Sequence, residues 1–275
     1  MSCLIYVDPS PRGEWALALA RLLLSALRPP LVLLATDDDV QRHPELLEQA
    51  RVRLGRAEAV ALRHRPGPAE RAIVAEAAEA HPDLIVVPPA GRKAIARMMR
   101  GSRVATVVRK VQADVLVARR PPPAIRRVLA ALSGGRLTQT VAEAAARLAG
   151  PLGAELLFLH VAPEVTLPFG HHPPVPVPAG ASGETDALAA VRAAAARVGA
   201  VRVDAREGLV VEEVLEEVEA GAHDLLVLGA SSAPAAQQWA LEDVTERVLL
   251  RCPVSTLIVR EEDAAPPNAT EPAVR

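Results

Sequence analysis

Asp83-Leu84-Ile85-Val86-Val87 recurs along the chain as Asp224-Leu225-Leu226-Val227-Leu228, and this repetition decides the fold. Positions 83 and 224 differ by 141 residues, and the same shift pairs residues 115–119 with residues 256–260. Each run is short, apolar and continuous, which is typical of a strand that is covered on both faces of a parallel sheet. Similarity at a fixed spacing over so much of the chain predicts two copies of one domain in tandem.

A second shift relates the front halves of the two copies. Residues 4–8 pair with residues 129–133, and residues 31–36 pair with residues 156–161, at a shift of 125 residues. The two shifts, 141 and 125, differ by 16 residues, so the second copy carries an insertion of that length. The insertion falls in the Pro-rich and Gly-rich stretch 168–176, which predicts a surface loop.

Strands and helices alternate strictly within the first copy. We expect strands at residues 3–7, 31–35, 57–63, 83–87 and 114–119, separated by helices at residues 14–27, 44–54, 69–80 and 102–110. This order predicts an α/β fold with a doubly wound parallel sheet and helices on both faces. Ligands of such sheets bind beyond the carboxyl ends of the strands, so the loops after the first, second and fourth strands are candidate sites.

Proline-rich segments mark the expected domain boundaries. We expect a first domain at residues 1–120, a Pro-rich linker at 121–125, a second domain at 126–260 and a disordered tail at 261–275. A length of 275 residues fits two such domains better than one hydrophobic core. Half of the residues are hydrophobic but only 2% are aromatic, so the cores consist mainly of Leu, Val, Ile and Ala.

Charge and cysteine usage narrow the class of protein. With 31 basic and 33 acidic residues, the net charge of −2 provides no field that would draw the chain onto nucleic acid or an anionic membrane. No apolar run approaches the roughly 20 residues that span a bilayer, and the first residues do not read as a secretory signal. Cys3 and Cys252 lie at opposite ends of the sequence, so we expect no disulfide framework and a reducing cytoplasm.

The loop after the fourth strand carries the strongest binding signal. It runs from Pro88 to Gly101-Ser102, which stand directly before an apolar helical pattern. Free backbone N–H groups and the helix dipole favour an anion at such a terminus, and glycine lets a phosphate approach closely. A Gly-Ser pair alone would be equally typical of an ordinary helix N-cap.

With its surroundings, this loop resembles the nucleotide loop of the universal stress protein family. That loop follows the fourth strand and has the spacing Gly, two residues, Gly, nine residues, Gly-Ser. Here Gly91, nine residues and Gly101-Ser102 match, Asp8 matches the acidic residue that contacts the base in such proteins, and residues 83–86 match the run before the loop. The resemblance covers almost the whole chain. It implies two Rossmann-like domains, of which the first binds ATP or a related adenine nucleotide, with or without Mg, in stress response or signalling and not in catalysis.

The resemblance implies a binding role for eight residues of the first copy. They are Asp8, Thr36, Pro88, Gly91, Arg92, Gly101, Ser102 and Arg103. Asp8 would hold the base, Gly91 and Gly101 would let the backbone approach closely, and Ser102 with the helix dipole would hold the phosphates.

Two features of this loop bear on its affinity for phosphate. Arg92 and Arg103 belong to a basic group that could neutralise a triphosphate or could form a solvated face. Pro88 departs from the family pattern because it stands where the first glycine would be, which removes one backbone N–H and fixes φ.

The second copy departs further from the pattern. Gly229 keeps the first glycine, but Ser232 replaces the second, and Glu242-Asp243 pair with Gly101-Ser102. Two carboxylates would repel a phosphate, although acidic residues also stabilise the first turn of a helix without any ligand. Ser133 stands in place of Asp8. We interpret the second copy as a degenerate domain that lost triphosphate binding.

Three alternatives accompany this interpretation. Residues 133–138, Ser-Gly-Gly-Arg-Leu-Thr, resemble the Ser-Gly-Gly-x-Asp-Ser pyrophosphate loop of adenylating enzymes, but the aspartate is missing and the repeat explains the segment as the turn after a first strand. His171-His172 with His160 could indicate a metal site, but no carboxylate or cysteine cluster accompanies them. The third alternative is that neither copy binds nucleotide and that the chain is an interaction module. No common catalytic motif is present in the sequence.

The resemblance also implies how the two copies meet. Proteins of this family pair two domains across the edge strand that ends each domain. Residues 114–119 and 255–260 could pair in this way within one chain, which would form a pseudo-dimer and remove two exposed sheet edges. A protein partner or a homodimer is also compatible with the sequence.

Overall fold

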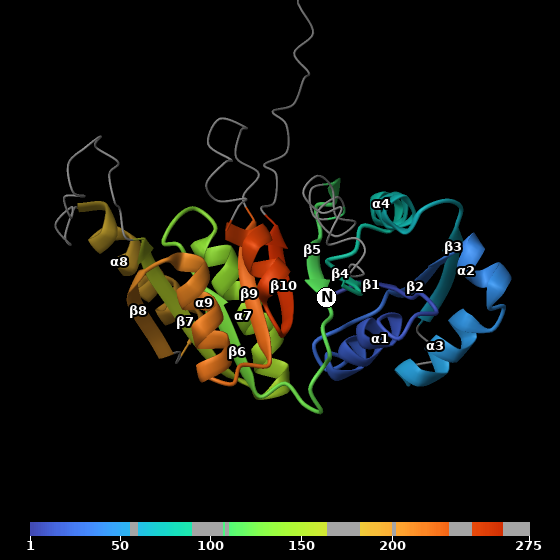
Figure 1. Cartoon of the computed structure of the whole chain (residues 1–275), viewed down its shortest axis with the longest axis horizontal. Helices are drawn as coiled ribbons and strands as arrows, with labels where there is room; N and C mark the ends of the chain where they lie inside the picture. Colours follow the sequence, from blue (N-terminus) through green and yellow to red (C-terminus); the bar gives the residue numbers. More distant parts are fainter. Residues whose placement is uncertain are drawn as a thin grey trace, which may run out of the picture.

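Ten strands of the computed structural model form one continuous sheet (Figure 1). The structure describes residues 1–55, 60–89, 107, 110–163, 182–199, 202–230 and 244–260. The strands are β1 (Cys3–Tyr6), β2 (Leu31–Thr36), β3 (Val60–Arg65), β4 (Leu84–Val87), β5 (Asp114–Val117), β6 (Arg127–Ala131), β7 (Glu155–Pro163), β8 (Arg202–Gly208), β9 (Leu225–Ala230) and β10 (Ser255–Arg260). Their spatial order is β3-β2-β1-β4-β5-β10-β9-β6-β7-β8, so the first five belong to one copy and the last five to the other.

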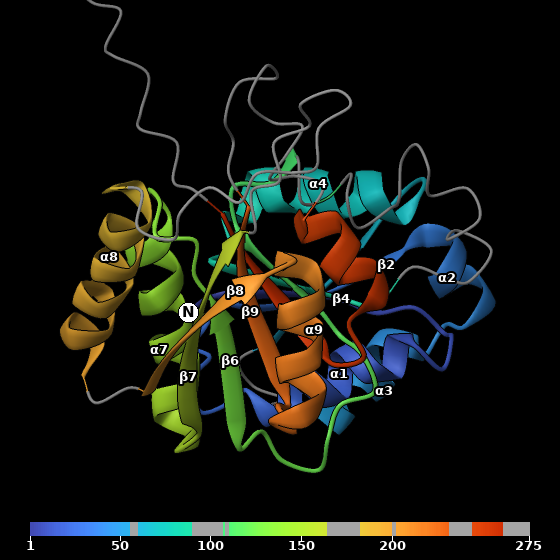
Figure 2. The ribbon, with the colours of Figure 1, turned by 60° about the vertical axis from the view of Figure 1, so that its left-hand side comes forward.

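Helices cover both faces of this sheet (Figure 2). They are α1 (Gly13–Leu22), α2 (Asp37–Arg42), α3 (Leu46–Leu54) and α4 (Ala69–Ala80) in the first copy, and α7 (Thr138–Leu152), α8 (Ser182–Val198) and α9 (Val210–Ala220) in the second. Residues 244–251 form a further helix. α1 and α3 pack on one face of their strands and α4 on the other, while α7 and α8 lie opposite α9. The fold is therefore the predicted α/β architecture.

Alternation along the strands explains why both faces are apolar. Ile5 of β1 packs with α1 and α3, whereas its neighbours Leu4 and Tyr6 pack with α4 on the other face. All four residues of β1 are buried, and so are all residues of β2 and β4. The continuous apolar runs in the sequence follow from this two-sided burial.

The two copies meet where β5 pairs with β10, and this contact is the one antiparallel pairing of the sheet. Leu116 stands opposite Leu257. Beyond the paired strands, the backbone N–H of Arg119 donates to Ser255 Oγ at 3.0 Å, and that hydroxyl donates to the Arg119 carbonyl at 3.1 Å. The predicted pairing of residues 114–119 with residues 255–260 is confirmed, and it turns two sheet edges into the centre of one sheet.

Helix bounds agree with the prediction in one place and differ in two. α4 spans the predicted residues 69–80, but α1 ends at Leu22 and continues only as tight turns. A helix that was not predicted, α2, begins directly after β2 because Thr36 caps it. The predicted helix at 102–110, apart from residues 107 and 110, lies outside the described residues, as do the insertion at 168–176 and the tail.

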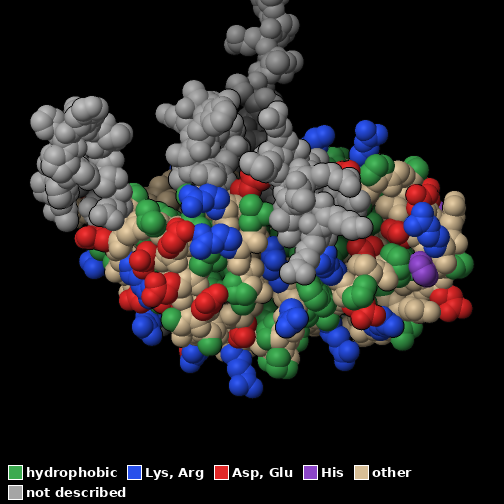
Figure 3. Space-filling model, viewed as in Figure 1, with side chains coloured by type: hydrophobic (Ala, Val, Ile, Leu, Met, Phe, Trp, Pro, Cys, Tyr) green, Lys and Arg blue, Asp and Glu red, His purple; other side chains and the backbone are tan. Residues whose placement is uncertain are grey.

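Charged side chains of both signs are interspersed over the described surface on the face shown in Figure 3. This mixture agrees with the near-neutral net charge of −2. A protein with this surface has no evident electrostatic preference for a polyanion on that face.

Candidate functional site

The carboxyl edge of the first copy brings together three of the eight residues that the sequence predicts to bind a nucleotide. Asp8 follows β1, Thr36 ends β2 and Pro88 follows β4, and these strands are neighbours in the order β2-β1-β4. The other five, namely Gly91, Arg92, Gly101, Ser102 and Arg103, lie outside the described residues.

Asp8 organises the turn between β1 and α1. Its Oδ1 accepts hydrogen bonds from the backbone N–H of Ser10 at 2.9 Å and from the Ser10 hydroxyl. The same hydroxyl oxygen accepts from the backbone N–H groups of Arg12 at 3.3 Å and Gly13 at 3.2 Å, so it caps the start of α1. Within the part of the chain that the structure describes, Asp8 Oδ2 makes no hydrogen bond. One carboxylate oxygen is thus structural and the other is free for a ligand.

Gly13 is required by this turn, although sequence reasoning did not single it out. A Cβ at this position would lie 2.1 Å from the carbonyl oxygen of Asp8 and 2.6 Å from its Oδ1. Real side chains do not tolerate such distances, so the absence of a side chain lets α1 begin directly against Asp8. A glycine five residues after an aspartate that ends a strand was the available signal.

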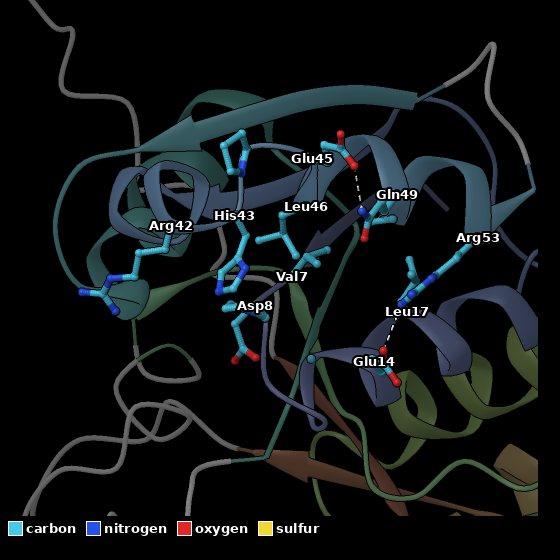
Figure 4. A pocket seen from close by; sticks show the side chains of 14 residues that line it. Val7, Asp8, Glu14, Leu17, Arg42, His43, Glu45, Leu46, Gln49 and Arg53 are labelled. Carbon is cyan, nitrogen blue, oxygen red and sulfur yellow. Dashed lines mark hydrogen bonds and ion pairs between the residues drawn. The ribbon is translucent and has the colours of Figure 1, made fainter.

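A cavity of about 470 Å³ lies beside Asp8, between the β1–α1 turn and the N-terminal half of α3 (Figure 4). Val7, Leu17 and Ala50 give it an apolar floor. His43 and Gln49 stand at its polar rim. A concave site that combines apolar and polar side chains can take a small molecule.

The polar rim of this cavity is held in place by pairs of side chains. The Gln49 amide donates to Glu45 at 3.1 Å, and the Arg53 guanidinium donates to Glu14 at 2.9 Å (Figure 4). Arg53 comes from α3 and Glu14 from α1, so this ion pair joins the two helices that flank the cavity. Both partners are largely exposed, so the pair contributes little to stability.

Thr36 has a structural use at the end of β2. Its hydroxyl oxygen accepts from the backbone N–H of Asp39 at 3.2 Å, and its hydrogen is donated to Asp39 Oδ2 at 2.6 Å. The hydroxyl of Tyr6 donates to the same oxygen at 3.2 Å. Because the Thr36 side chain caps α2, only its backbone remains available to a ligand.

The aspartate that opens each recurring strand lies at the opposite edge of the sheet. Asp83 Oδ2 accepts from the backbone N–H of Ser2 at 2.7 Å and from its hydroxyl at 3.0 Å. Asp224 Oδ2 likewise accepts from the backbone N–H groups of Arg126 at 2.7 Å and Arg127 at 3.0 Å. In both copies this aspartate joins the start of the fourth strand to the start of the first, which is a structural role.

Comparison with known proteins identifies the family of both copies. The sequence profile of the universal stress protein family matches residues 8–119 and 124–260. The chain belongs to this family. A comparison with proteins of curated function finds no match by sequence.

Solved structures of universal stress proteins match both copies of this chain in fold. A universal stress protein from Archaeoglobus fulgidus is 16% identical with a TM-score of 0.72, and the match covers 94% of this chain and 98% of the other. A protein from Pseudomonas aeruginosa assigned to the same family is 18% identical with a TM-score of 0.75, covering 95% of this chain and 94% of the other. The cytoplasmic domain of a prokaryotic cation chloride cotransporter is 13% identical with a TM-score of 0.54, and 94% of each chain is covered. At these identities the likeness shows the fold alone.

The second universal stress protein domain has a different carboxyl edge. Residues 133–137 form the turn between β6 and α7, as the repeat predicts, and α7 begins at Thr138; Ser133 Oγ accepts from the backbone N–H of Gly135 at 3.3 Å. His160 is only 4% exposed, and its Nδ1 donates to the Leu132 carbonyl at 2.9 Å. His171 and His172 lie outside the described residues. Among the residues that are described, no three His, Cys, Asp or Glu side chains are grouped to hold a metal ion.

The helices differ from membrane-spanning helices in length and hydropathy. In the described parts of the chain, every helix is too short or too polar to cross a bilayer.

Proposed function

We propose that the first copy binds an adenine nucleotide, ATP or a close relative, at the carboxyl edge of β1, β2 and β4. The observation that carries this proposal is the cavity of about 470 Å³ beside Asp8. It lies at the strand edge where open α/β sheets take their ligands. Its apolar floor suits the face of a nucleobase, and its free carboxylate oxygen suits an amino group at the edge of that base.

The phosphates would extend from this cavity toward the loop after β4. Gly91 and Gly101 would allow the backbone to approach them, and Ser102 at a helix N-terminus would donate to them. Arg92 and Arg103 would offset their charge, together with Mg where it is bound. Pro88 provides no N–H at the start of the loop, so the proposal does not use it as a donor.

Binding without turnover is the proposed outcome of this arrangement. Nucleotide would alter the conformation of the loop after β4 and hence the choice of a protein partner or of a second copy, in a stress response or in signalling. The proposal places the chain in the reducing cytoplasm because Cys3 and Cys252 are both buried free thiols.

Calorimetric titration of the full chain with Mg-ATP tests the proposal. Asp8→Asn keeps the acceptor for Ser10 but removes the charge, so affinity should fall about 10-fold or more, the usual loss for a hydrogen bond to a charged group. Asp38→Asn makes the same change on the exposed face of α2 and should leave affinity unchanged. Gly101→Glu, which copies the acidic second domain, should abolish binding.

The number of sites separates the remaining interpretations. One site per chain, lost in Gly101→Glu, supports the proposal. Two sites per chain would contradict the degeneracy of the second copy. No heat at millimolar Mg-ATP would overturn the proposal in favour of an interaction module.

A further inference from the structure

The two copies can be compared position by position at the site of the cavity. The backbone N–H of Val7 donates to the Leu34 carbonyl at 2.8 Å, and the backbone N–H of Leu132 donates to the Leu159 carbonyl at 2.8 Å. These bonds are related by the shift of 125 residues that the sequence gives. The turns after β1 and β6 are therefore spatial equivalents, and Pro9 corresponds to Gly134.

A helix lies directly against the turn of the second copy. A Cβ on Gly134 would lie 2.4 Å from the Cβ of Ala187 and 2.5 Å from its Cα, so α8 touches the turn with no room for any side chain. In the first copy the equivalent Pro9 carries a full ring and still lines an open cavity. The turn beside β1 therefore borders a cavity, whereas the turn beside β6 contacts α8 at Gly134.

The length and composition of α8 explain this close approach. α8 has 17 residues, whereas in the first copy two shorter helices, α2 with 6 residues and α3 with 9, follow the second strand. Small residues of α7 and α8 belong to one buried cluster, and small side chains let two helix axes come close. These residues are Ala142, Ala145 and Ala149 of α7 and Ala194 and Ala195 of α8.

A buried histidine lies on β7, the strand beside β6 in the second copy. His160 takes the position of Ala35 and shares the face of Phe158, which packs with α7 and α8. Its ring is 4% exposed and is fixed by the bond to the Leu132 carbonyl. An imidazole thus stands where the first copy has one methyl group.

We infer that α8 is a built-in occupant of the cleft of the second copy, so that the described residues of this copy leave no small-molecule pocket equivalent to the one beside Asp8. The position of α8 would make the two copies differ in ligand binding independently of the acidic residues Glu242-Asp243. Only the count of ligand sites rests on the proposed function. The packing of α8 against Gly134 does not.

Substitution of Gly134 tests the packing. Gly134 and Gly153 both have positive φ, +78° and +62°, but a Cβ at Gly153 would meet nothing within 4 Å. Both Gly134→Ala and Gly153→Ala introduce backbone strain, because both positions have positive φ. Only Gly134→Ala also displaces α8 from the β6–α7 turn. We expect the unfolding midpoint of Gly134→Ala to fall about 5 °C further than that of Gly153→Ala. Equal midpoints for the two variants would overturn the inference.

Hydrogen exchange on the unmodified chain gives a measurement that does not depend on the folding of variants. Amides of residues 188–195 should exchange as slowly as those of α7. Exchange at the rate of an unfolded chain would overturn the inference, because a helix that often leaves the cleft does not occupy it.

Adenosine is the probe for the number of pockets because it has no phosphate for Glu242-Asp243 to repel. At most one adenosine should bind per chain, with no change in exchange along α8. A second adenosine that alters exchange at residues 188–195 would overturn the inference. Absence of any adenosine binding would count against the proposed function alone, since the Gly134→Ala variant and the exchange of α8 still decide the packing.

Discussion

The guanidinium of Arg65 on β3 donates to the carboxylate of Glu76 on α4, and the same pair recurs 141 residues later as Arg206 on β8 and Glu217 on α9. The Glu76 side chain is only 5% exposed, whereas Arg65 also reaches Glu79, which is 68% exposed. The repeat therefore preserves a buried ion pair that ties the outer strand of each copy to the helix after it.

Replacing Glu76 should destabilise the first copy more than replacing its exposed neighbour. Glu76→Ala removes the buried partner of Arg65, which keeps only the exposed Glu79, so the free energy of unfolding should fall. Glu79→Ala removes the exposed partner of the same arginine and should lower the free energy of unfolding less. Urea unfolding of both variants checks this, and similar midpoints would show that burial of Glu76 contributes nothing.

Stability should decline in acid as the carboxylates paired with arginine become protonated. A hydrogen bond from Arg65 lowers the pKa of Glu79 below its usual 4.5, and a hydrogen bond from Arg251 lowers the pKa of Glu212 in the same way. A carboxylate with a lowered pKa in the folded state stabilises fully above its unfolded pKa, and this contribution is lost as the pH falls through the folded value. The temperature at the midpoint of unfolding should therefore fall as the pH is lowered below about 4.5.

The matched variants for this acid dependence are Glu79→Gln and Glu212→Gln. Each removes one of the titrating groups, so the decline between pH 5 and pH 3 should become shallower. An unchanged slope in both would mean that other carboxylates dominate the acid response.

Alkaline pH should act through the buried thiol of Cys3. Burial raises the pKa of this thiol well above its usual 9.0, so it stays protonated in the folded chain where the unfolded chain would ionise. A group with a raised pKa stabilises fully below its unfolded pKa, and the contribution is lost as the pH rises beyond it. Thermal unfolding between pH 8 and pH 10.5 should show a decline that is weaker in Cys3→Ala, and a parallel decline in both proteins would exclude this thiol as a cause.

Much of the fold could be predicted because it depends on local pattern. The bounds of α4 follow from Pro68 before it and from an apolar stripe, whereas the pairing of β5 with β10 was expected from the resemblance to universal stress proteins and not from local pattern. α2 was missed because three consecutive aspartates after β2 do not form an apolar stripe. They form a helix start because Thr36 caps it and acidic residues stabilise its first turn.

The candidate site was less accessible to prediction because its shape depends on distances between helices. Asp8 was identified as a site residue, and the structure puts a cavity beside it. The cavity itself depends on how far α3 stands from the β1–α1 turn, which no residue pattern specifies. The corresponding region of the second copy depends in the same way on α8, whose contact with Gly134 joins segments more than 50 residues apart.

The seam between the copies should respond strongly to the loss of one hydroxyl. Ser255 is fully buried, and its hydroxyl both accepts from the Arg119 N–H and donates to the Arg119 carbonyl. Ser255→Ala leaves these backbone groups unpaired, which costs about 1–3 kcal/mol. Unfolding by urea should show a lower midpoint for Ser255→Ala, and a midpoint equal to that of the unmodified chain would mean that water replaces the hydroxyl.

Adding a methyl group at Gly13 should weaken both stability and nucleotide binding. That methyl group would lie 2.1 Å from the Asp8 carbonyl oxygen, so the β1–α1 turn would have to move. Gly150 in α7 is the matched control, since a Cβ there would meet nothing within 4 Å. Alanine favours a helix over glycine by about 0.5–1 kcal/mol, but Pro151 disfavours a Cβ on the residue before it, so Gly150→Ala should change the stability of the chain little. Gly13→Ala should instead lower the unfolding midpoint and reduce the affinity for Mg-ATP, measured by calorimetry on both variants. A Gly13→Ala protein that binds Mg-ATP as tightly as the unmodified chain would show that the β1–α1 turn does not position Asp8 for the ligand.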